Sequence, residues 1–389
     1  MRITDIETLI LRVPDLREDA TSSSQDDFVV RIHTDEGIIG IGESDTGPWL
    51  GKAGVEAPGS HSMALGIRDL LIGEDPFDTT AIWEKLYVGT CMSGRRGALI
   101  CVLGAIDMAL WDIKGKALGL PVYKLLGGAC QKSIRPYASL QPEGTSVEEY
   151  GASLVRWVKR AKEYGFSAAK LECTLDGPYR HEKLKGTDEQ MTEILTACRQ
   201  EAGPEFTLMV DVQYLWYDAK SALRTIRKWD HLDLFFLETP LRVDNLEGYA
   251  LLAKESPIRI AAGEWLNTRF EFLELMDKGL IDVAQPDVGR VGGLTEAMRV
   301  CHMAQDRGRL IVPHCWKTGI GIAASAHMAF AVPHCPFIEF LPAELCDSAL
   351  RRELVTDELK IVDGYIHPPT KPGLGIELNE EAVEKYRVD

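Results

Sequence analysis

Five polar residues follow short apolar runs at regular intervals in the second half of the chain. They are Asp211 after FTLMV, Glu238 after LFFL, Glu264 after IAAG, Asp287 after AQP and His314 after LIVP. Consecutive members lie 23 to 27 residues apart, about the length of one strand, one helix and their loops. In a parallel barrel the carboxyl ends of the strands meet on one face. The spacing therefore predicts that all five side chains converge on one point.

Three of these residues, Asp211, Glu238 and Glu264, are carboxylates from consecutive units. Oxygen ligands without a thiolate or a cluster of imidazoles favour Mg²⁺ over zinc. Without a cation, converging carboxylates in a sheltered pocket would repel one another and resist ionisation. One such residue alone could be a solvated strand end or the partner of a lysine. The set of three predicts one Mg²⁺ ion per active site.

The other two residues, Asp287 and His314, are predicted to lie at neighbouring strand ends. A carboxylate beside an imidazole orients the ring and stabilises its protonated form, which suits an acid/base histidine. The alternative is a core histidine that is hydrogen-bonded to the backbone. Next to the predicted metal site we favour the acid/base interpretation.

A second candidate base lies in the apolar run SAAKLEC, where Lys170 and Glu172 are two residues apart. Alternate residues of a strand point to the same face, so both are predicted to face the barrel interior while Ala169 and Leu171 pack on helices. A bound cation would lower the pKa of a neighbouring lysine, which could then act as a base. A purely structural Lys–Glu ion pair is the alternative.

The elements that must position these residues begin with a separate N-terminal part. Residues 1–43 read as three antiparallel strands. Residues 60–126 read as helices and include a long amphipathic segment, 98–118, which is stopped by Gly119 and Pro121.

After Gly127 and Gly128 the chain alternates between short apolar runs and segments of helical periodicity. The eight runs are IRPYASL, SAAKLEC, FTLMVDV, LDLFFLET, RIAAGE, DVAQPD, LIVPH and FIEFL. The helical segments between them are 146–164, 188–201, 218–228, 245–254, 269–277, 293–307 and 320–331. Eight strands alternating with helices predict an α/β fold with a parallel barrel. A further strand-like piece, LKIVDGYIHPP, is expected to pack against the N-terminal part.

The composition is that of an ordinary globular enzyme, with 45% hydrophobic and 26% charged residues. The net charge of −16 disfavours binding to nucleic acid or to anionic membranes. The nine cysteines contain no CxxC pair, and their odd number and irregular spacing favour a reducing cytoplasm over a disulfide framework. The N-terminus lacks a signal-peptide core, and no run approaches the roughly 18 apolar residues of a membrane span. We expect a cytoplasmic homo-oligomer with a small-molecule substrate.

Two glycine-rich segments suggest an alternative, the binding of an anion. Gly319-x-Gly321-x-x-Ala324 follows a strand and opens a helix, with Glu339 ending the next strand, and so mimics a dinucleotide-binding fingerprint. It comes after six strand–helix units rather than at the start of a nucleotide-binding half, which disfavours that function. The segment 289–293 could cradle an anion at a helix N-terminus, but a tight loop is the simpler interpretation.

Residues 105–128 read AIDMALWDIKGKALGLPVYKLLGG. This stretch resembles a signature of the mandelate racemase/muconate lactonizing enzyme group of the enolase superfamily. The later pieces MVDVQ, FLETP, AAGEW, QPDVGRVGG and VPHCW match the same group in order and spacing, so the resemblance covers nearly the whole chain. It implies an α+β capping domain at 1–128, a modified (β/α)7β TIM-type barrel at 129–350, and a C-terminal segment, 351–389, that packs back on the capping domain.

The resemblance also implies roles for individual residues. The three carboxylates would bind Mg²⁺, which holds the substrate carboxylate, and Asp287 with His314 would form the acid/base dyad of the mandelate racemase-like branch. Glu339 would hydrogen-bond the substrate carboxylate. The muconate lactonizing branch carries a lysine near the position of Asp287, and none is found there in this chain, which disfavours that mechanism. The family usually has Lys-x-Lys on the second strand, whereas this chain has Lys170-Leu-Glu172, which argues against two-base racemization.

Together these observations predict abstraction of the α-proton of a carboxylate substrate to give an enediolate. Dehydration of a sugar acid to a 2-keto-3-deoxy acid is the favoured outcome. Racemization, epimerization or cycloisomerization of a hydroxy acid or sugar lactone is the second possibility, and a catalytically silent binding protein is the third. A metal hydrolase is disfavoured because IRPYASL contains no HxH pair. The predicted catalytic residues are Lys170, Asp287, His314 and Glu339.

Substrate specificity is expected from two loops of the capping domain, roughly residues 15–26 and 46–54. Inside the barrel, the strand-end motifs supply further polar and aromatic side chains. The predicted substrate-binding residues are Trp49, Glu172, Gln213 and Trp265.

Overall fold

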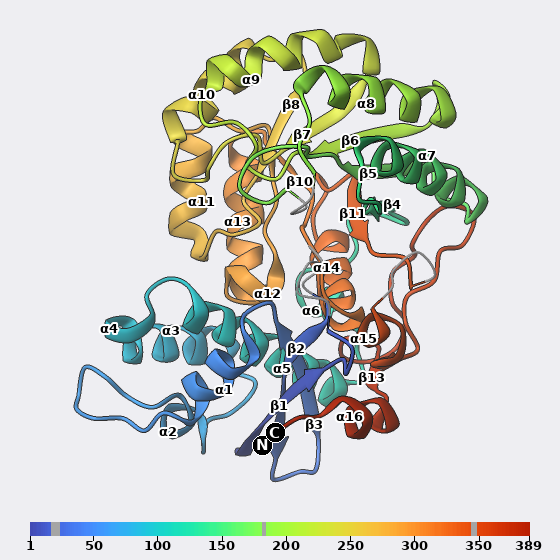
Figure 1. Cartoon of the computed structure of the whole chain (residues 1–389). Helices are drawn as coiled ribbons and strands as arrows, with labels where there is room; N and C mark the ends of the chain where they lie inside the picture. Colours follow the sequence, from blue (N-terminus) through green and yellow to red (C-terminus); the bar gives the residue numbers. More distant parts are fainter. Residues whose placement is uncertain (17–23, 181–183, 344–347) are drawn as a thin grey trace.

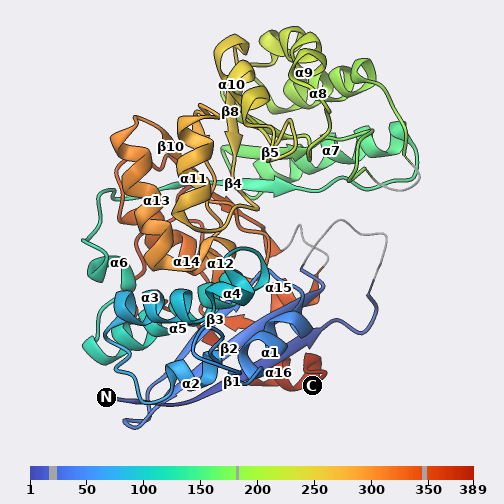
Figure 2. The ribbon, with the colours of Figure 1, turned by 90° about the vertical axis from the view of Figure 1, so that its left-hand side faces the viewer.

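The computed structural model of the chain describes residues 1–16, 24–180, 184–343 and 348–389. Two parts stack on each other: an antiparallel sheet with its helices, and a curled parallel sheet wrapped by helices (Figures 1 and 2). The predicted α/β fold, with a parallel barrel-type sheet and an N-terminal capping sheet, is confirmed. The predicted specificity loop at 15–26 lies largely outside the described residues.

The capping sheet has three antiparallel strands in the order β1, β2, β3. These are β1 (Ile3–Arg12), β2 (Asp26–Thr34) and β3 (Ile39–Ser44). The turn between β2 and β3 contains Gly37 at φ 78°, a backbone conformation that glycine adopts without strain. Five helices accompany the sheet: α1 (Pro48–Glu56), α2 (Ile67–Leu71), α3 (Thr79–Gly89), α4 (Cys91–Gly94) and α5 (Ala98–Leu118).

Helix α5 packs directly on β3 and joins the two parts of the molecule. A Cβ added at Gly40 or Gly42 would lie 2.1 or 2.0 Å from a backbone oxygen of α5, so this close approach requires glycine. The predicted amphipathic character of α5 is wrong, because residues 100–113 are all buried. One side of α5 contacts the capping sheet and another contacts barrel helices, which leaves little room for a polar face.

The second sheet has eight parallel strands in the order β10-β9-β8-β7-β6-β5-β4-β11. They are β4 (Arg135–Leu140), β5 (Ala168–Glu172), β6 (Thr207–Asp211), β7 (Leu234–Glu238), β8 (Arg259–Ala262), β9 (Val283–Ala284), β10 (Leu310–Ile311) and β11 (Phe337–Phe340). All eight lie inside the predicted apolar runs. The last strand, β11, pairs with the first, β4, so the sheet curls round. At the junction of β10 and β11 the Ile311 amide donates to the His334 carbonyl at 3.1 Å.

Helices connect the strands at the predicted positions, within two residues of the expected bounds. They are α7 (Val147–Glu163), α8 (Asp188–Ala202), α9 (Ala219–Ile226), α10 (Leu246–Glu255), α11 (Thr268–Asp277), α13 (Leu294–Asp306) and α14 (Gly319–Phe330). Side-chain caps define several starts, as at Ser146 before α7 and Thr187 before α8. The short helix α6 (Val122–Leu125) lies within residues 60–126, which were predicted to be helical, and η1 (Arg227–Leu232) extends beyond the predicted 218–228. The sequence did not predict α12 (Val288–Val291).

The inside of the curled sheet is filled by side chains, so it is a packed core and not a channel. Each strand or its immediate end contributes one residue: Tyr137, Ala168, Met209, Phe236, Ala261, Val283, Val312 and Phe337. The polar residues at the carboxyl ends of the strands therefore lie next to a layer of apolar side chains that fills the inside of the sheet.

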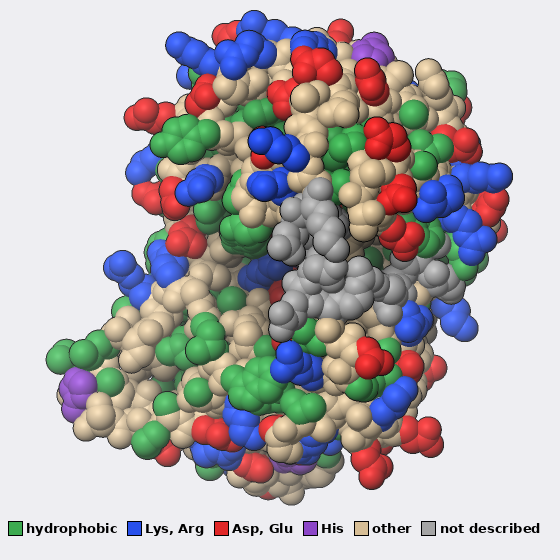
Figure 3. All heavy atoms as spheres, viewed as in Figure 1, with side chains coloured by type: hydrophobic (Ala, Val, Ile, Leu, Met, Phe, Trp, Pro, Cys, Tyr) green, Lys and Arg blue, Asp and Glu red, His purple; other side chains and the backbone are tan. Residues whose placement is uncertain are grey.

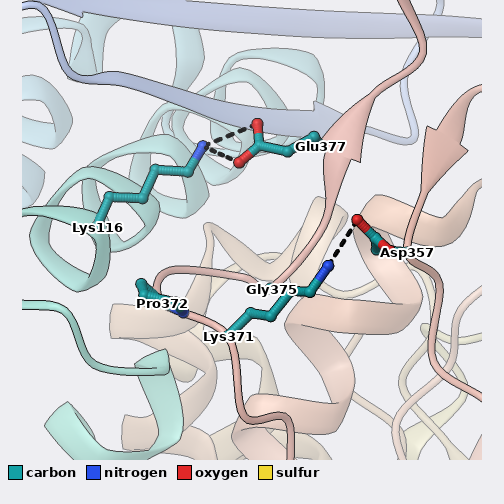
Figure 4. A pocket seen from close by; sticks show the side chains of 6 residues that line it. All are labelled: Lys116, Asp357, Lys371, Pro372, Gly375 and Glu377. Atoms are coloured by element: carbon teal, nitrogen blue, oxygen red, sulfur yellow. Dashed lines mark hydrogen bonds and ion pairs between the residues drawn. The ribbon is translucent and has the colours of Figure 1, made fainter.

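The C-terminal segment lies partly along the capping sheet (Figure 1). Arg31 of β2 pairs with Glu380 at 2.7 Å, and the Val388 amide donates to the Ile10 carbonyl at 3.0 Å. A surface hollow of about 380 Å³ lies between α5 and this segment, where Lys116 pairs with Glu377 (Figure 4). The elements of the segment are α15 (Ala349–Glu353), β12 (Val355–Thr356), β13 (Glu377–Leu378) and α16 (Glu380–Tyr386).

The strand predicted in LKIVDGYIHPP is wrong. Residues 359–369 form no strand; Val362 pairs with Tyr365 across a turn that contains Gly364 at φ 79°. Ile366 exchanges hydrogen bonds with Ile134, just before β4, so this piece contacts the barrel.

The described residues include no helix long and apolar enough to cross a membrane. The eight described cysteines form no disulfide with one another. On the face shown in Figure 3, acidic and basic side chains are interspersed over the outer helices of the barrel.

Candidate active site

The structure brings the five strand-end residues together at the carboxyl end of the curled sheet. Asp211 and Glu238 are the last residues of β6 and β7 and pair in register. Glu264 follows β8, Asp287 is the N-cap of α12, and His314 follows β10. Each of the five has at most 8% of its surface exposed.

The three carboxylates influence one another's ionisation. Burial raises the pKa of Asp211 well above its usual value, and the charges of Glu238 and Glu264 add to the rise. Asp211 Oδ1 accepts hydrogen bonds from the Gln213 amide, at 2.9 Å, and from the Thr239 hydroxyl. A cation would relieve this repulsion, and an oxygen-only donor set fits a hard divalent ion.

The carboxylate oxygens are turned toward protein partners. Glu238 Oε1 accepts from Lys170 at 3.0 Å, and its Oε2 accepts from Gln285 Nε2 at 2.6 Å. Glu264 Oε1 accepts from the Tyr214 hydroxyl at 2.6 Å. Accordingly, no three His, Cys, Asp or Glu side chains of the described ranges stand in metal-binding geometry.

Lys170 lies at the centre of this network. Its Nζ is 3.0 Å from Glu238 and 2.8 Å from Glu339, above the ring of Tyr137 at 5.7 Å. Burial lowers the pKa of Lys170, but the charges of Glu238 and Glu339 outweigh it and raise this pKa well above its usual value. Glu339 also accepts from the Ser139 hydroxyl at 2.7 Å. In this state Lys170 is a cation that balances two carboxylates.

Asp287 and His314 form a direct pair. Asp287 Oδ2 lies 2.7 Å from His314 Nδ1, while its Oδ1 accepts from the Gly289 amide at 2.7 Å. His314 Nε2 lies 3.1 Å from Glu264. Burial and the charge of Arg290 lower the pKa of His314, but the surrounding carboxylates outweigh them and raise it to about 9. The geometry provides an oriented imidazolium next to the carboxylate cluster.

Two family models match the chain over most of its length. One, described as the mandelate racemase/muconate lactonizing enzyme N-terminal domain, matches residues 8–127, and one described as enolase C-terminal domain-like matches residues 153–382. The chain belongs to the enolase superfamily. Within it, the chain falls in the mandelate racemase/muconate lactonizing enzyme group, as the sequence motifs predicted.

Relatives in this group act on sugar acids and their lactones. The chain is 30% identical over 368 residues to a D-galactarolactone cycloisomerase from Agrobacterium fabrum, which covers 92% of this chain and 91% of the relative. It is 31% identical over 363 residues to a D-galactonate dehydratase from Pectobacterium atrosepticum, covering 91% and 89% of the two chains. The structure of the 3,6-anhydro-D-galactonate cycloisomerase from Zobellia galactanivorans matches with a TM-score of 0.86 and 30% identity over 100% of both chains.

Two predicted substrate-binding residues of this enolase-superfamily enzyme lie at the site. Glu172 ends β5 and pairs in register with Asp211, and it is buried. Gln213 follows β6 with φ 48°, and its Oε1 is buried without a hydrogen-bond partner among the described residues. A buried amide oxygen of this kind is suited to accept a hydrogen bond from a ligand hydroxyl.

The two predicted tryptophans differ in position. Trp265 directly follows Glu264 and is 42% exposed, with its ring centroid 4.4 Å from Tyr214 and 5.1 Å from Tyr179. These three rings form an aromatic wall beside the carboxylate cluster. Trp49 lies on α1 of the capping part, half exposed, with the guanidinium of Arg12 at 5.5 Å from its ring.

Sequence reasoning missed three residues of the site: Tyr214, Gln285 and Arg290. Gln285 could have been found, because it lies two residues before Asp287 and alternate strand residues share a face. Tyr214 had no such signal; it reaches Glu264 because the chain turns through φ 60° after β6. Arg290 lies in α12, a helix too short to show periodicity.

A carboxylate of the capping part lies at the start of α14 and excludes the dinucleotide-binding alternative. The carboxylate of Glu43, from β3, accepts from the amides of Thr318 at 3.3 Å and Gly321 at 2.6 Å. A Cβ at Gly321 would lie 2.6 Å from Glu43 Oε1, so this glycine makes room for the carboxylate. The helix N-terminus that a phosphate would need is already occupied.

The segment 289–293 is neither the expected tight loop nor an anion cradle, because residues 289–291 belong to the short helix α12. The amide of Thr295, at the start of α13, donates to Asp107 of α5 at 2.8 Å. A Cβ at Gly293 would lie 2.4 Å from the Asp107 side chain. The capping part thus supplies a carboxylate to the N-termini of two barrel helices.

Proposed function

We propose that this enzyme abstracts the α-proton of a sugar acid and expels the β-hydroxyl, giving a 2-keto-3-deoxy acid. The observation that carries the proposal is the contact of two acid/base side chains with one buried carboxylate cluster. Lys170 Nζ lies 3.0 Å from Glu238, and His314 Nε2 lies 3.1 Å from Glu264. A substrate held at this cluster would have both proton-transfer groups within reach. The similarity to a D-galactonate dehydratase supports dehydration as the outcome.

Asp211, Glu238 and Glu264 would hold the Mg²⁺ ion on which we expect the reaction to depend. The bound cation would supply positive charge next to the substrate carboxylate, where negative charge develops as the α-proton leaves. The chain contributes oxygen donors at the ends of three neighbouring strands. Tyr214 and Gln285 hydrogen-bond Glu264 and Glu238 and so orient them.

His314 is suited to the role of general acid. Its raised pKa, about 9, keeps the ring protonated at neutral pH. Asp287 binds Nδ1, so the Nε2 proton, which lies beside Glu264 Oε2 at 3.1 Å in this structure, is the one that would go to the departing hydroxyl. Lys170 is the candidate base; its Nζ can accept a proton only when the charges of Glu238 and Glu339 are partly offset, because these charges raise its pKa.

Cycloisomerization of a sugar lactone is the second candidate. It is favoured by the similarity to two cycloisomerases, which act on D-galactarolactone and 3,6-anhydro-D-galactonate. Both candidates begin with loss of the α-proton and differ in the bond that breaks next.

The test is to incubate the enzyme with Mg²⁺ and a library of sugar acids and lactones in D₂O and to follow products by NMR. We expect a 2-keto-3-deoxy acid from one open-chain acid. His314→Asn should slow dehydration by about 10²–10⁴-fold while exchange of the α-proton by Lys170 continues. Lys170→Ala, the matched variant, should lose exchange as well.

A ring-opened or isomerised lactone, with no keto-deoxy acid from any open-chain substrate, would favour the second candidate. Unimpaired dehydration by His314→Asn would remove the dyad from the mechanism.

A further inference from the structure

A buried arginine beside the carboxylate cluster has no part in the proposed chemistry. Arg290 is in α12, three residues after Asp287, and 13% of its side chain is exposed. Its Nη1 donates to the Glu264 carbonyl oxygen at 3.1 Å and lies 4.0 Å from Glu264 Oε2. The carbonyl of Arg290 accepts from Asn267 Nδ2 at 2.7 Å. The backbone of Arg290 is therefore held in place, and the position of its guanidinium depends on the acceptors around it.

The carboxylate that holds this guanidinium comes from the capping part. Asp45 follows β3, and its Oδ2 accepts a hydrogen bond from Arg290 Nη2. Its Oδ1 lies 3.4 Å from Lys317 Nζ, and 8% of the side chain is exposed. The neighbouring Ser44 hydroxyl lies 3.5 Å from the Gly289 carbonyl, which ties this loop to the start of α12.

We propose that Asp45 is a positioning residue for the metal site: it holds Arg290 away from the Glu264 carboxylate, whose Oε2 already lies 3.1 Å from His314 Nε2, so that the guanidinium does not compete with the cation there. The inference rests on the proposed function, because it requires Glu264 to be a metal ligand. A buried guanidinium without a counter-ion is strongly unfavourable, and its planar fork matches a carboxylate. After loss of Asp45, two carboxylates still attract the guanidinium: Asp287, and Glu264, whose Oε2 lies 4.0 Å from Arg290 Nη1. Arg290 would then compete with the cation for the same oxygen.

Lys317 does not have this role, although it also contacts Asp45. Its Nζ donates to the Asp26 carbonyl at 2.8 Å and lies 3.5 Å from Asp26 Oδ1. Lys317 therefore keeps partners when Asp45 is changed, and Arg290 is the cation that is released.

This arrangement makes metal affinity depend on the docking of the capping part on α12, although the capping part supplies no ligand in the proposed site. Removal of Asp45 leaves Asp211, Glu238 and Glu264 chemically intact. We attribute the expected loss of metal binding to the released arginine, and removal of the arginine charge should reverse it.

The experiment is calorimetric titration of the full-length protein with Mg²⁺. Asp45→Asn should raise the Kd by about 10–100-fold, the usual effect of losing an outer contact of a ligand. The double variant Asp45→Asn/Arg290→Gln should bind Mg²⁺ nearly as well as the wild type, because no charge is released. Asp26→Asn, which alters the other partner of Lys317, is the matched control and should leave the Kd unchanged.

Wild-type affinity in a folded Asp45→Asn variant would overturn the inference. So would an Arg290→Gln variant that binds Mg²⁺ as weakly as Asp45→Asn, because Arg290 would then assist binding. If Asp45→Asn does not fold, Arg290→Gln and the double variant still decide between these outcomes. Glu238→Gln distinguishes a failure of the proposed metal site from a failure of the inference about Asp45. If the wild type binds Mg²⁺ no better than Glu238→Gln, the metal site is wrong, and the inference that rests on it is wrong too.

Discussion

Among the residues that the structure describes, two buried groups of three carboxylates look alike by residue type. The barrel cluster is Asp211, Glu238 and Glu264; the seam cluster, where the capping part meets the barrel, is Asp27, Glu43 and Asp45. All six residues are buried or nearly so. Burial raises the pKa of Asp27 well above its usual value, with Glu43 adding to the rise, just as it does for Asp211 with Glu238.

The clusters differ in their donors and in the room around them. Glu43 binds amides at the start of α14, and Asp45 lies between Arg290 and Lys317. The cavity beside these two carboxylates is about 10 Å³, enough for about one water molecule. The barrel cluster is adjacent to the half-exposed Trp265, and its carboxylates contact Lys170 and His314 as well as the neutral donors Tyr214 and Gln285. Buried acids alone therefore do not identify a metal site; the barrel cluster differs in its position at the strand ends, beside two candidate acid/base side chains.

The largest expected difference between the clusters is in turnover. Glu238→Gln should reduce kcat by about 10²–10³-fold or more, because the variant lacks a charge in the proposed metal site. Glu43→Gln, the matched change in the seam cluster, should keep most of its turnover and instead unfold at lower urea, with a loss of about 1–3 kcal/mol. Steady-state assays and urea titrations of both variants measure this contrast. A Glu43→Gln variant that loses turnover but keeps full stability would contradict the predicted contrast between the two clusters.

The barrel cluster could be predicted from the sequence, and the seam cluster could not. Asp211, Glu238 and Glu264 each end a strand, and the regular strand–helix spacing places them on one face. Glu43 and Thr318 meet across 275 residues, and Asp45 and Arg290 across 245. No local pattern encodes such contacts, because they depend on how the capping part docks on the barrel.

Dependence on distant parts of the chain also explains why the sequence predictions for α5 and for residues 359–369 were wrong. The burial of α5 on several sides depends on the barrel that covers it, so its own residues read as an ordinary amphipathic helix. Residues 359–369 have the apolar content of a strand, but Gly364 at φ 79° turns the chain back on itself. Strand ends repeat at a regular interval and can be predicted from the sequence, whereas contacts between the capping part and the barrel cannot.

A smaller effect concerns the pH dependence of stability. Burial raises the pKa of Asp45, but Arg290 and Lys317 outweigh it and lower this pKa to about 2. A carboxylate with a lowered pKa stabilises the folded state fully above its usual pKa, and this contribution is lost as the pH falls toward 2. Asp45→Asn should therefore cost about 2 kcal/mol at pH 7 and progressively less from roughly pH 5 to pH 2.5. Urea unfolding of both proteins across this range measures the difference, and a gap that stays constant with pH would contradict the ion-pair explanation.

The most direct test of the contrast between the clusters is Mg²⁺ binding by two matched aspartate variants. Asp211 and Asp27 are both buried and both have a raised pKa, so their intrinsic properties are similar. Calorimetric titration should show that Asp211→Asn weakens Mg²⁺ binding by about 10²-fold or more, since a proposed ligand is lost, while Asp27→Asn binds like the wild type. Equal weakening in both variants, or wild-type binding by Asp211→Asn, would contradict the assignment of the metal site to the barrel cluster.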